Sequence, residues 1–118
     1  MSRAGVRFRP CAFTPTWDKH RGARCQGVQI HITDRRSLEP VRLGVACIVH
    51  ARNHDPGRFG WRTEKYEFVE TIPAIDLLAG SEGFRKGIEA GKGVSDLCDA
   101  WQTECDEFVR KRAPYLLY

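Results

Sequence analysis

The feature that most constrains the fold is a strict alternation of apolar and polar residues in residues 27–36, "GVQIHITDRR". Three β-branched residues alternate there with three neutral polar residues: Val28, Ile30 and Ile32 with Gln29, His31 and Thr33. A period of two predicts a β-strand with one apolar and one polar face. We expect the apolar face to point into the core beneath two main helices. The polar face has no Lys or Glu, which raises the question of whether it forms part of a binding site.

Other patterns predict the remaining elements. Residues 6–13 and 64–70 alternate in the same way and predict two further strands, with a long loop at 14–27. Ser37 is expected to cap a helix over about 38–53, and Pro73 to begin a short helix that ends before Gly80. A further helical turn follows Ser81, and Ser95 is expected to cap a last helix with a continuous apolar stripe. The apolar tail "YLLY" (115–118) should then dock on the core.

These elements predict a small α/β (α+β) domain of about three strands, two main helices and short helical turns. A chain of 118 residues has the length of one domain with one hydrophobic core, so residues 1–118 are expected to form a single domain. No apolar run approaches the roughly 20 residues that span a bilayer, and the basic start "MSRAGVRFRP" lacks the apolar region of a secretory signal. The sequence therefore predicts a cytoplasmic protein that does not enter membranes.

The five cysteines are odd in number and include no C-x-x-C pair, so we expect reduced and mostly buried thiols. Cys47, His50 and His54 could share one helix face, but a fourth zinc ligand at suitable spacing is missing. Phosphate-loop and nucleophile-elbow motifs are also missing. Acidic residues are plentiful, yet no pair among them is marked out as a catalytic pair. We expect no metal, no cofactor and no self-contained catalytic centre.

Basic and aromatic residues are interleaved in the first third of the chain: Arg7, Arg9, Lys19, Arg21, Arg24, Arg35 and Arg36 with Phe8, Phe13 and Trp17. Such a cluster could bind nucleic acid. It could equally grip a smaller anion such as an acidic sugar, or simply be a solvated strand edge and loop. The net charge of +4 favours anionic partners without choosing among these.

Several sequence segments, taken in order, are similar to those of a known family: "GVRFRP-x-x-FTPT", "C-x-GVQIHITDRR-x-x-x-PVR-x-G", "FGWR", "YEFV-x-x-x-PAIDLLAGS" and "YLLY". Together they closely resemble the C-terminal auxiliary domain of the peptidoglycan exo-β-N-acetylmuramidase family, long catalogued as a domain of unknown function. The likeness runs from about Gly5 to Tyr118.

The resemblance implies a partner and a reaction. In that family a larger N-terminal Rossmann-like domain supplies most of the catalytic machinery, and the substrate cleft lies where the two domains meet. The enzymes release N-acetylmuramic acid from non-reducing ends of peptidoglycan fragments. The first of these segments begins at Gly5, so we expect the Rossmann-like domain to be absent from the chain. The expected function is an auxiliary domain of this glycoside hydrolase that is inactive alone.

The resemblance also gives the polar strand face a candidate ligand. Gln29, His31 and Thr33 suit the hydroxyls and amide of muramic acid, and Arg35 or Arg36 could take its carboxylate. Tyr66 and Asp76 complete the candidate substrate-binding residues. The alternatives are a polar face that packs on the Rossmann-like domain, and a standalone binding module for nucleic acid or an acidic saccharide, of which nucleic acid is the less expected ligand.

We also expect an exposed apolar patch around Tyr66, Ile72 and Ile75, where the Rossmann-like domain would sit, and possible self-association through it.

Overall fold

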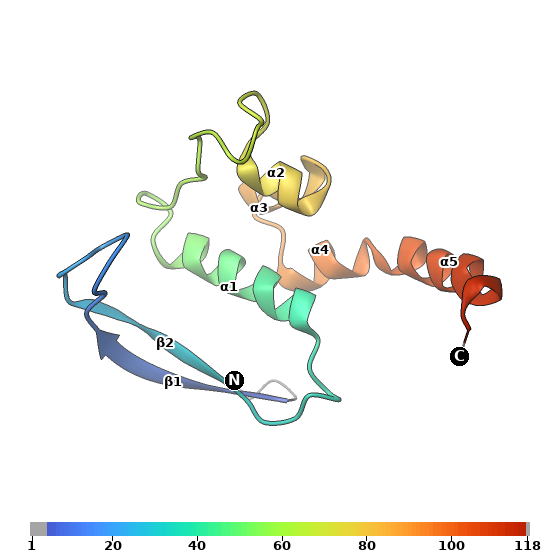
Figure 1. Ribbon diagram of the computed structural model, residues 1–118, viewed down its shortest axis with the longest axis horizontal. Helices are drawn as coiled ribbons and strands as arrows, with labels where there is room; N and C mark the ends of the chain where they lie inside the picture. The colour runs from blue at the N-terminus through green and yellow to red at the C-terminus, as the bar shows by residue number, and fades with distance from the viewer. Residues whose placement is uncertain (1–4, 118) are drawn as a thin grey trace. The chain divides into compact units, whose positions relative to one another are not determined.

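The computed structural model describes residues 5–117 of the chain, and its fold is a small α+β arrangement of two antiparallel strands and several helices (Figure 1). The chain divides into two compact units, the first ending at Pro40 and the second beginning at Val41. We describe each unit by itself. The first contains the strands, and the second contains the helices.

The first unit is a β-hairpin formed by β1 (Val6–Phe13) and β2 (Cys25–Ile32). The two strands pair antiparallel over their whole length, from Val6 opposite Ile32 to Phe13 opposite Cys25. Residues that lie directly opposite each other in an antiparallel pair point to the same face. The register therefore fixes two faces, an apolar one and a polar one. The sequence predicted both strands, although β2 begins at Cys25, inside the expected loop.

A tight turn joins the hairpin to the chain that follows, and it depends on Gly5. The backbone N–H of Thr33 donates to the carbonyl oxygen of Gly5 over 2.9 Å. Gly5 has a φ of +81°, and a Cβ atom built on it would lie 2.5 Å from the carbonyl oxygen of Asp34. Only glycine fits both the dihedral angle and this close approach.

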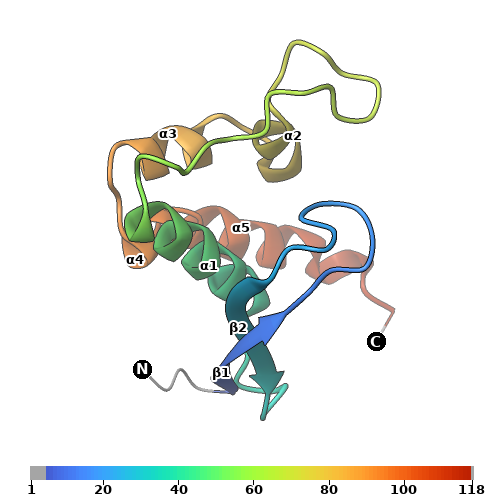
Figure 2. The same ribbon diagram turned by 90° about the vertical axis from the view of Figure 1, so that its left-hand side faces the viewer.

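The second unit consists of helices (Figure 2). Their bounds are α1 (Pro40–His54), α2 (Ala74–Ala79), α3 (Gly83–Glu89), α4 (Val94–Asp99), α5 (Gln102–Arg112) and the 3₁₀ helix η1 (Ala113–Tyr115). The predicted helix start needs correction. Helix α1 begins at Pro40, three residues after Ser37, so Ser37 is not at its N-cap position, and the Ser37 hydroxyl donates to the Asp34 carboxylate.

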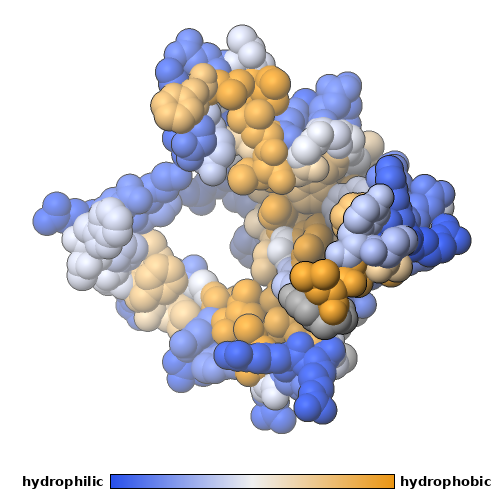
Figure 3. All heavy atoms as spheres, turned by 45° about the vertical axis from the view of Figure 1, so that its right-hand side comes forward, coloured by the Kyte–Doolittle hydropathy of each residue, from blue (hydrophilic) through white to orange (hydrophobic). Residues whose placement is uncertain are grey.

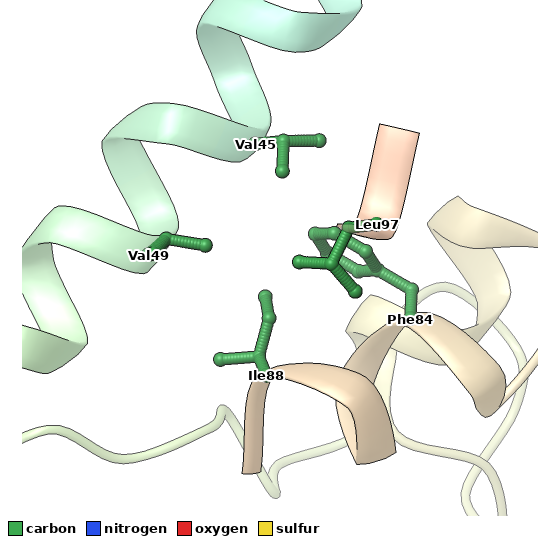
Figure 4. Packing of buried hydrophobic residues seen from close by; sticks show 5 residues of the cluster. All are labelled: Val45, Val49, Phe84, Ile88 and Leu97. Carbon is green, nitrogen blue, oxygen red and sulfur yellow. The ribbon is translucent and has the colours of Figure 1, made fainter. Parts of the chain in front are cut away.

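The core of the second unit forms where three helices meet (Figure 4). Its buried residues are Val45 and Val49 of α1, Phe84 and Ile88 of α3, and Leu97 of α4. Each pair on α1 and α3 is spaced i, i+4, so both members lie on one face of their helix. Trp101 packs against the cluster, its ring centroid 5.9 Å from that of Phe84.

The predicted third strand over residues 64–70 is wrong. This segment is irregular and contains one isolated antiparallel bridge, between Tyr66 and Val69. Glu67 has a φ of 53°, so the chain reverses direction within the segment. The alternation of apolar and polar residues therefore runs across a tight turn, where no extended strand can form.

The apolar face of β2 belongs to the hairpin unit, and its expected position beneath the two main helices stays a prediction. Val28, Ile30 and Ile32 are 57%, 40% and 54% exposed, whereas Val6 on the same face of the hairpin is 2% exposed. The alternation of apolar and polar residues fixes which side of a strand a side chain points to. It does not fix what covers that side.

The predicted last helix is broken into α4 and α5. The N–H of Trp101 bonds to the carbonyl of Cys98 over 3.3 Å, an i→i−3 bond that tightens the end of α4 and interrupts the helical ladder. The apolar stripe therefore changes direction, and only its first part reaches the core. The apolar tail does not dock either: Tyr115 is 81% and Leu117 95% exposed, while Tyr118 lies outside the described residues.

The expectation of mostly buried thiols is wrong as well. All five cysteines are free, but none is buried, and Cys47 and Cys105 are exposed. The apolar neighbours of a cysteine in sequence do not determine which side of its helix faces the core.

The burial pattern predicts where truncation is costly. Replacing Ile88, which is 1% exposed, with Ala should lower the free energy of unfolding by about 2–5 kcal/mol, because the change leaves a cavity between α1, α3 and α4. The matched change Leu78→Ala, at a residue of the same unit that is 68% exposed, should cost no more than about 1 kcal/mol. Urea denaturation of both variants measures the two losses. Equal losses would contradict this account of the core.

Candidate functional site

The polar face of the hairpin brings together basic and neutral hydrogen-bonding groups. Arg9 lies opposite Gln29, and Arg7 lies opposite His31. The Nη2 group of Arg9 donates to Oε1 of Gln29 over 2.8 Å. This bond uses the amide oxygen of Gln29 and leaves its amide N–H groups as donors. All four side chains are exposed, so the face can contact a polar ligand.

The turn after β2 places two more arginines beside this face. The carboxylate of Asp34 accepts the Arg36 backbone N–H over 2.9 Å and the Ser37 hydroxyl over 2.7 Å. The Ser37 hydrogen bond, followed by that from Arg36, holds the pKa of Asp34 below its usual value. Because the pKa is lowered by folding, this contribution to stability is present at neutral pH and is lost as the pH falls through the folded-state pKa. Arg35 and Arg36 are thereby held on an ordered turn.

A second polar cluster lies between α2 and α3. Asp76 of α2, 7% exposed, accepts hydrogen bonds from Arg85 of α3: Nε is 3.0 Å from both carboxylate oxygens, and Nη2 is 2.8 Å from Oδ2. Glu89 also accepts from Arg85 Nη1, over 3.3 Å. The hydrogen bonds that Arg85 donates to Asp76, more than those it donates to Glu89, raise the pKa of Arg85 above its ordinary value. The arginine remains charged and ties the two helices together.

This ion pair forms part of the lining of an open pocket of about 540 Å³. Other lining residues include Thr71, Ile72, Ser81 and Glu82. Because Arg85 already binds Asp76 and Glu89, it has little capacity left for an anionic ligand. The pocket can therefore offer hydroxyl groups, one further carboxylate and apolar surface.

Tyr66 belongs to neither site. It lies half-buried in the irregular segment before α2, with the Arg62 guanidinium 5.7 Å from its ring centroid. The distance fits a cation–π contact. Tyr66 is not among the residues that line the Asp76 pocket.

The six predicted site residues thus form three groups: Gln29, His31, Thr33 and Arg35 along β2 and its turn, Asp76 at the α2–α3 pocket, and Tyr66 on a separate segment. Sequence reasoning missed Arg85. Arg85 lies three residues after Glu82 and four residues before Glu89. This spacing was a signal for an ion-pair centre on one helix face.

Within residues 5–117, no three His, Cys, Asp or Glu side chains come close enough together to hold a metal ion. No helix of that part of the chain is long and apolar enough to cross a membrane.

Comparison with known proteins gives a consistent result. The family described as "Exo-beta-N-acetylmuramidase NamZ, C-terminal" matches residues 1–118. The "Peptidoglycan beta-N-acetylmuramidase NamZ" of Bacillus subtilis (strain 168) is 36% identical over 114 residues, which are 97% of this chain and 26% of that protein. The crystal structure of a DUF1343 family protein from Bacteroides fragilis NCTC 9343 matches with a TM-score of 0.76 and 25% identity, over 98% of this chain and 29% of that one. The chain thus spans little more than a quarter of either relative.

The buried Asp76–Arg85 pair is expected to contribute more to stability than the exposed Arg42–Asp99 pair. Arg85→Met should lower the free energy of unfolding several times more than Arg42→Met, because it leaves the buried Asp76 carboxylate without its principal partner. The Asp99 partner of Arg42 is 66% exposed and stays hydrated when its arginine is removed. Urea denaturation measures both losses, and the double variant Asp76→Asn/Arg85→Met should recover part of the larger one. Similar losses in the two single variants would show that the buried pair has no special structural role.

Proposed function

Because the chain belongs to the family of C-terminal domains of the exo-β-N-acetylmuramidase NamZ, we propose that it is an auxiliary domain that helps to form a cleft for N-acetylmuramic acid. In this proposal the rest of the cleft and the catalytic groups come from a Rossmann-like domain or subunit. The B. subtilis relative named as a peptidoglycan β-N-acetylmuramidase is about four times as long as the region matched.

The arrangement of carboxylates supports an auxiliary role. Glycoside hydrolysis usually requires two carboxyl groups that flank the scissile bond, one of them free to donate a proton. Among the described residues, Asp76 is the charged residue with a buried side chain, and Arg85 donates hydrogen bonds to both of its carboxylate oxygens. It is therefore a structural ion-pair partner of Arg85.

The observation that carries the proposal is the Arg9–Gln29 hydrogen bond on the polar hairpin face, next to Arg7 and His31. Muramic acid presents a carboxylate, an acetamido group and hydroxyls. Arginine binds carboxylates with paired N–H donors, and the Gln29 amide and His31 ring suit the neutral groups. An exposed hairpin supplies one wall of such a site. A second wall is needed to exclude water, and the Rossmann-like domain would provide it.

Exposed apolar side chains in the second unit support a docked partner. Phe68 is 92%, Leu78 68% and Ile72 47% exposed, whereas Tyr66 and Ile75, expected in the same patch, are half-buried. Figure 3 shows hydrophobic residues among hydrophilic ones on the surface of the face it displays. Apolar surface of this kind is typical of interfaces between domains. We propose that the Phe68 and Leu78 surface contacts the Rossmann-like domain.

A second candidate function is binding of a polyanion by the hairpin unit. Exposed Trp17 (76%) and Phe13 (52%) accompany the basic residues of the first unit. Aromatic rings with Arg and Lys can stack bases and contact phosphates. Binding to nucleic acid would weaken steeply with salt, whereas selective sugar binding would not. A salt titration with single-stranded DNA therefore separates this candidate from the first.

The proposal predicts that the purified chain alone does not release muramic acid from a chromogenic muramide. The physical reason is that residues 5–117 bring no free pair of carboxyl groups together in a closed site. The release assay, compared with buffer, tests this. Turnover well above buffer that disappears in Asp76→Asn or Glu67→Gln variants would overturn the auxiliary role.

The proposed contacts can be tested in a chimera in which this chain replaces the matching 114-residue region of the B. subtilis protein. Gln29→Ala and His31→Ala should each lower kcat/KM for the muramide by about 2- to 12-fold, the cost of losing one neutral hydrogen bond. The melting temperature should hardly change, because both side chains are exposed. Gln26→Ala is the matched control, since Gln26 lies on β2 but points to the opposite face. Unchanged kinetics in all three variants would remove the polar face from the substrate site.

A further inference from the structure

Helix α5 is a helix without a buried residue. All of its residues from Gln102 to Arg112 are exposed, and so is the chain that follows as far as Leu117. Figure 1 shows α5 extending away from α1, α2 and α3. An isolated helix of 11 residues is marginal in water, since helices of this length usually depend on packing of an apolar face.

An apolar stripe nevertheless runs along α5. Cys105, Phe108 and Val109 are spaced i, i+3 and i+4, which places them on one face. Phe108 is 61% and Val109 50% exposed. Leu116, 55% exposed, continues the apolar surface beyond the helix. This stripe is the part of the expected last-helix face that does not reach the core.

The charges of α5 are divided between its two halves. The first half carries Glu104, Asp106 and Glu107, and the second half carries Arg110, Lys111 and Arg112. Such a distribution interacts favourably with the helix dipole, but that interaction does not explain the exposed apolar stripe. Among residues 5–117, none of these six side chains forms an ion pair. By helical spacing, Glu104, Lys111 and Arg112 lie beside or on the face that carries Phe108, so their charges are available to a partner there.

We propose that the partner of α5 is the α5 helix of a second copy of this chain, packed antiparallel about a two-fold axis near Phe108. In this register, Glu104 faces Lys111 and Arg112 of the other copy, and each contact occurs twice. Phe108 and Val109 of one copy would cover Phe108 and Val109 of the other copy across the axis. A parallel pair would instead set acidic half against acidic half and basic half against basic half. The sequence of α5 is thus complementary to itself in one orientation only.

The size of this surface sets the expected strength. A helix of 11 residues is about 16 Å long, and with the tail it is smaller than the surfaces that bury roughly 1,200–2,000 Å² in stable complexes. The dimer should therefore be weak and concentration-dependent. It involves a surface separate from Phe68 and Leu78, so it does not rest on the proposed enzymatic role.

Sedimentation equilibrium of the full chain in reducing buffer tests the proposal. The wild type should shift from monomer to dimer with increasing concentration. The variants Glu104→Lys and Lys111→Glu/Arg112→Glu should each dimerise at least about tenfold more weakly, because like charges then face each other. An equimolar mixture of the two variants should form a heterodimer. The control Lys92→Glu, which changes an exposed charge outside α5, should behave as the wild type.

A wild type that stays monomeric at every concentration would overturn the proposal, and so would a mixture that does not form a heterodimer. Crosslinking provides an independent readout if the charge changes unfold α5. In the antiparallel register, Phe108→Cys should form a disulfide-linked dimer on oxidation through position 108. The two native Cys105 residues would be offset by about 9 Å along the axis, too far for a disulfide bond. A dimer linked through Cys105, or no link through position 108, contradicts the antiparallel pair.

Discussion

The packing of α3 against α1 and α4 is the contact on which the second unit depends. Phe84 and Ile88 turn one face of α3 toward Val45, Val49 and Leu97 (Figure 4). Gly87 permits a close approach, since a Cβ atom there would lie 2.6 Å from Cδ2 of Leu97. Arg85, one position beyond Phe84, lies on a different face of the same helix and donates to Asp76 of α2 and to Glu89. One short helix thus connects the core with the α2–α3 pocket.

The hairpin unit depends on a different constraint, the pairing register of β1 and β2. This register places Arg9 opposite Gln29 and Arg7 opposite His31. A slip of one residue would move all four side chains relative to their partners and exchange the two faces of the slipped strand. Gly5 and the Asp34 turn hold the open end of the hairpin and so protect the register. The polar face is therefore built by backbone geometry, with the Arg9–Gln29 bond as its cross-strand link.

Local sequence patterns were sufficient for some elements and insufficient for others. The alternation in β2 and the i, i+4 valines of α1 carry their own periodicity, and the structure confirms both elements. The turn at Glu67 and the break at Trp101 were missed, because each depends on backbone angles and tertiary contacts that composition does not specify. Of the candidate site, the polar face of β2 followed from the alternation of residues alone. The partner of Asp76 did not, because Arg85 reaches it only when α2 and α3 pack.

The central claim is that this chain contributes one wall of a muramic acid site and needs a partner to complete it. The most direct measurement is an NMR titration of the isotope-labelled chain with N-acetylmuramic acid, with and without the remaining part of the B. subtilis relative. The account predicts weak or no shifts for the chain alone, and saturable shifts at Gln29, His31 and Arg9 when the partner is present. Saturable shifts confined to other residues, or none in the presence of the partner, would contradict it.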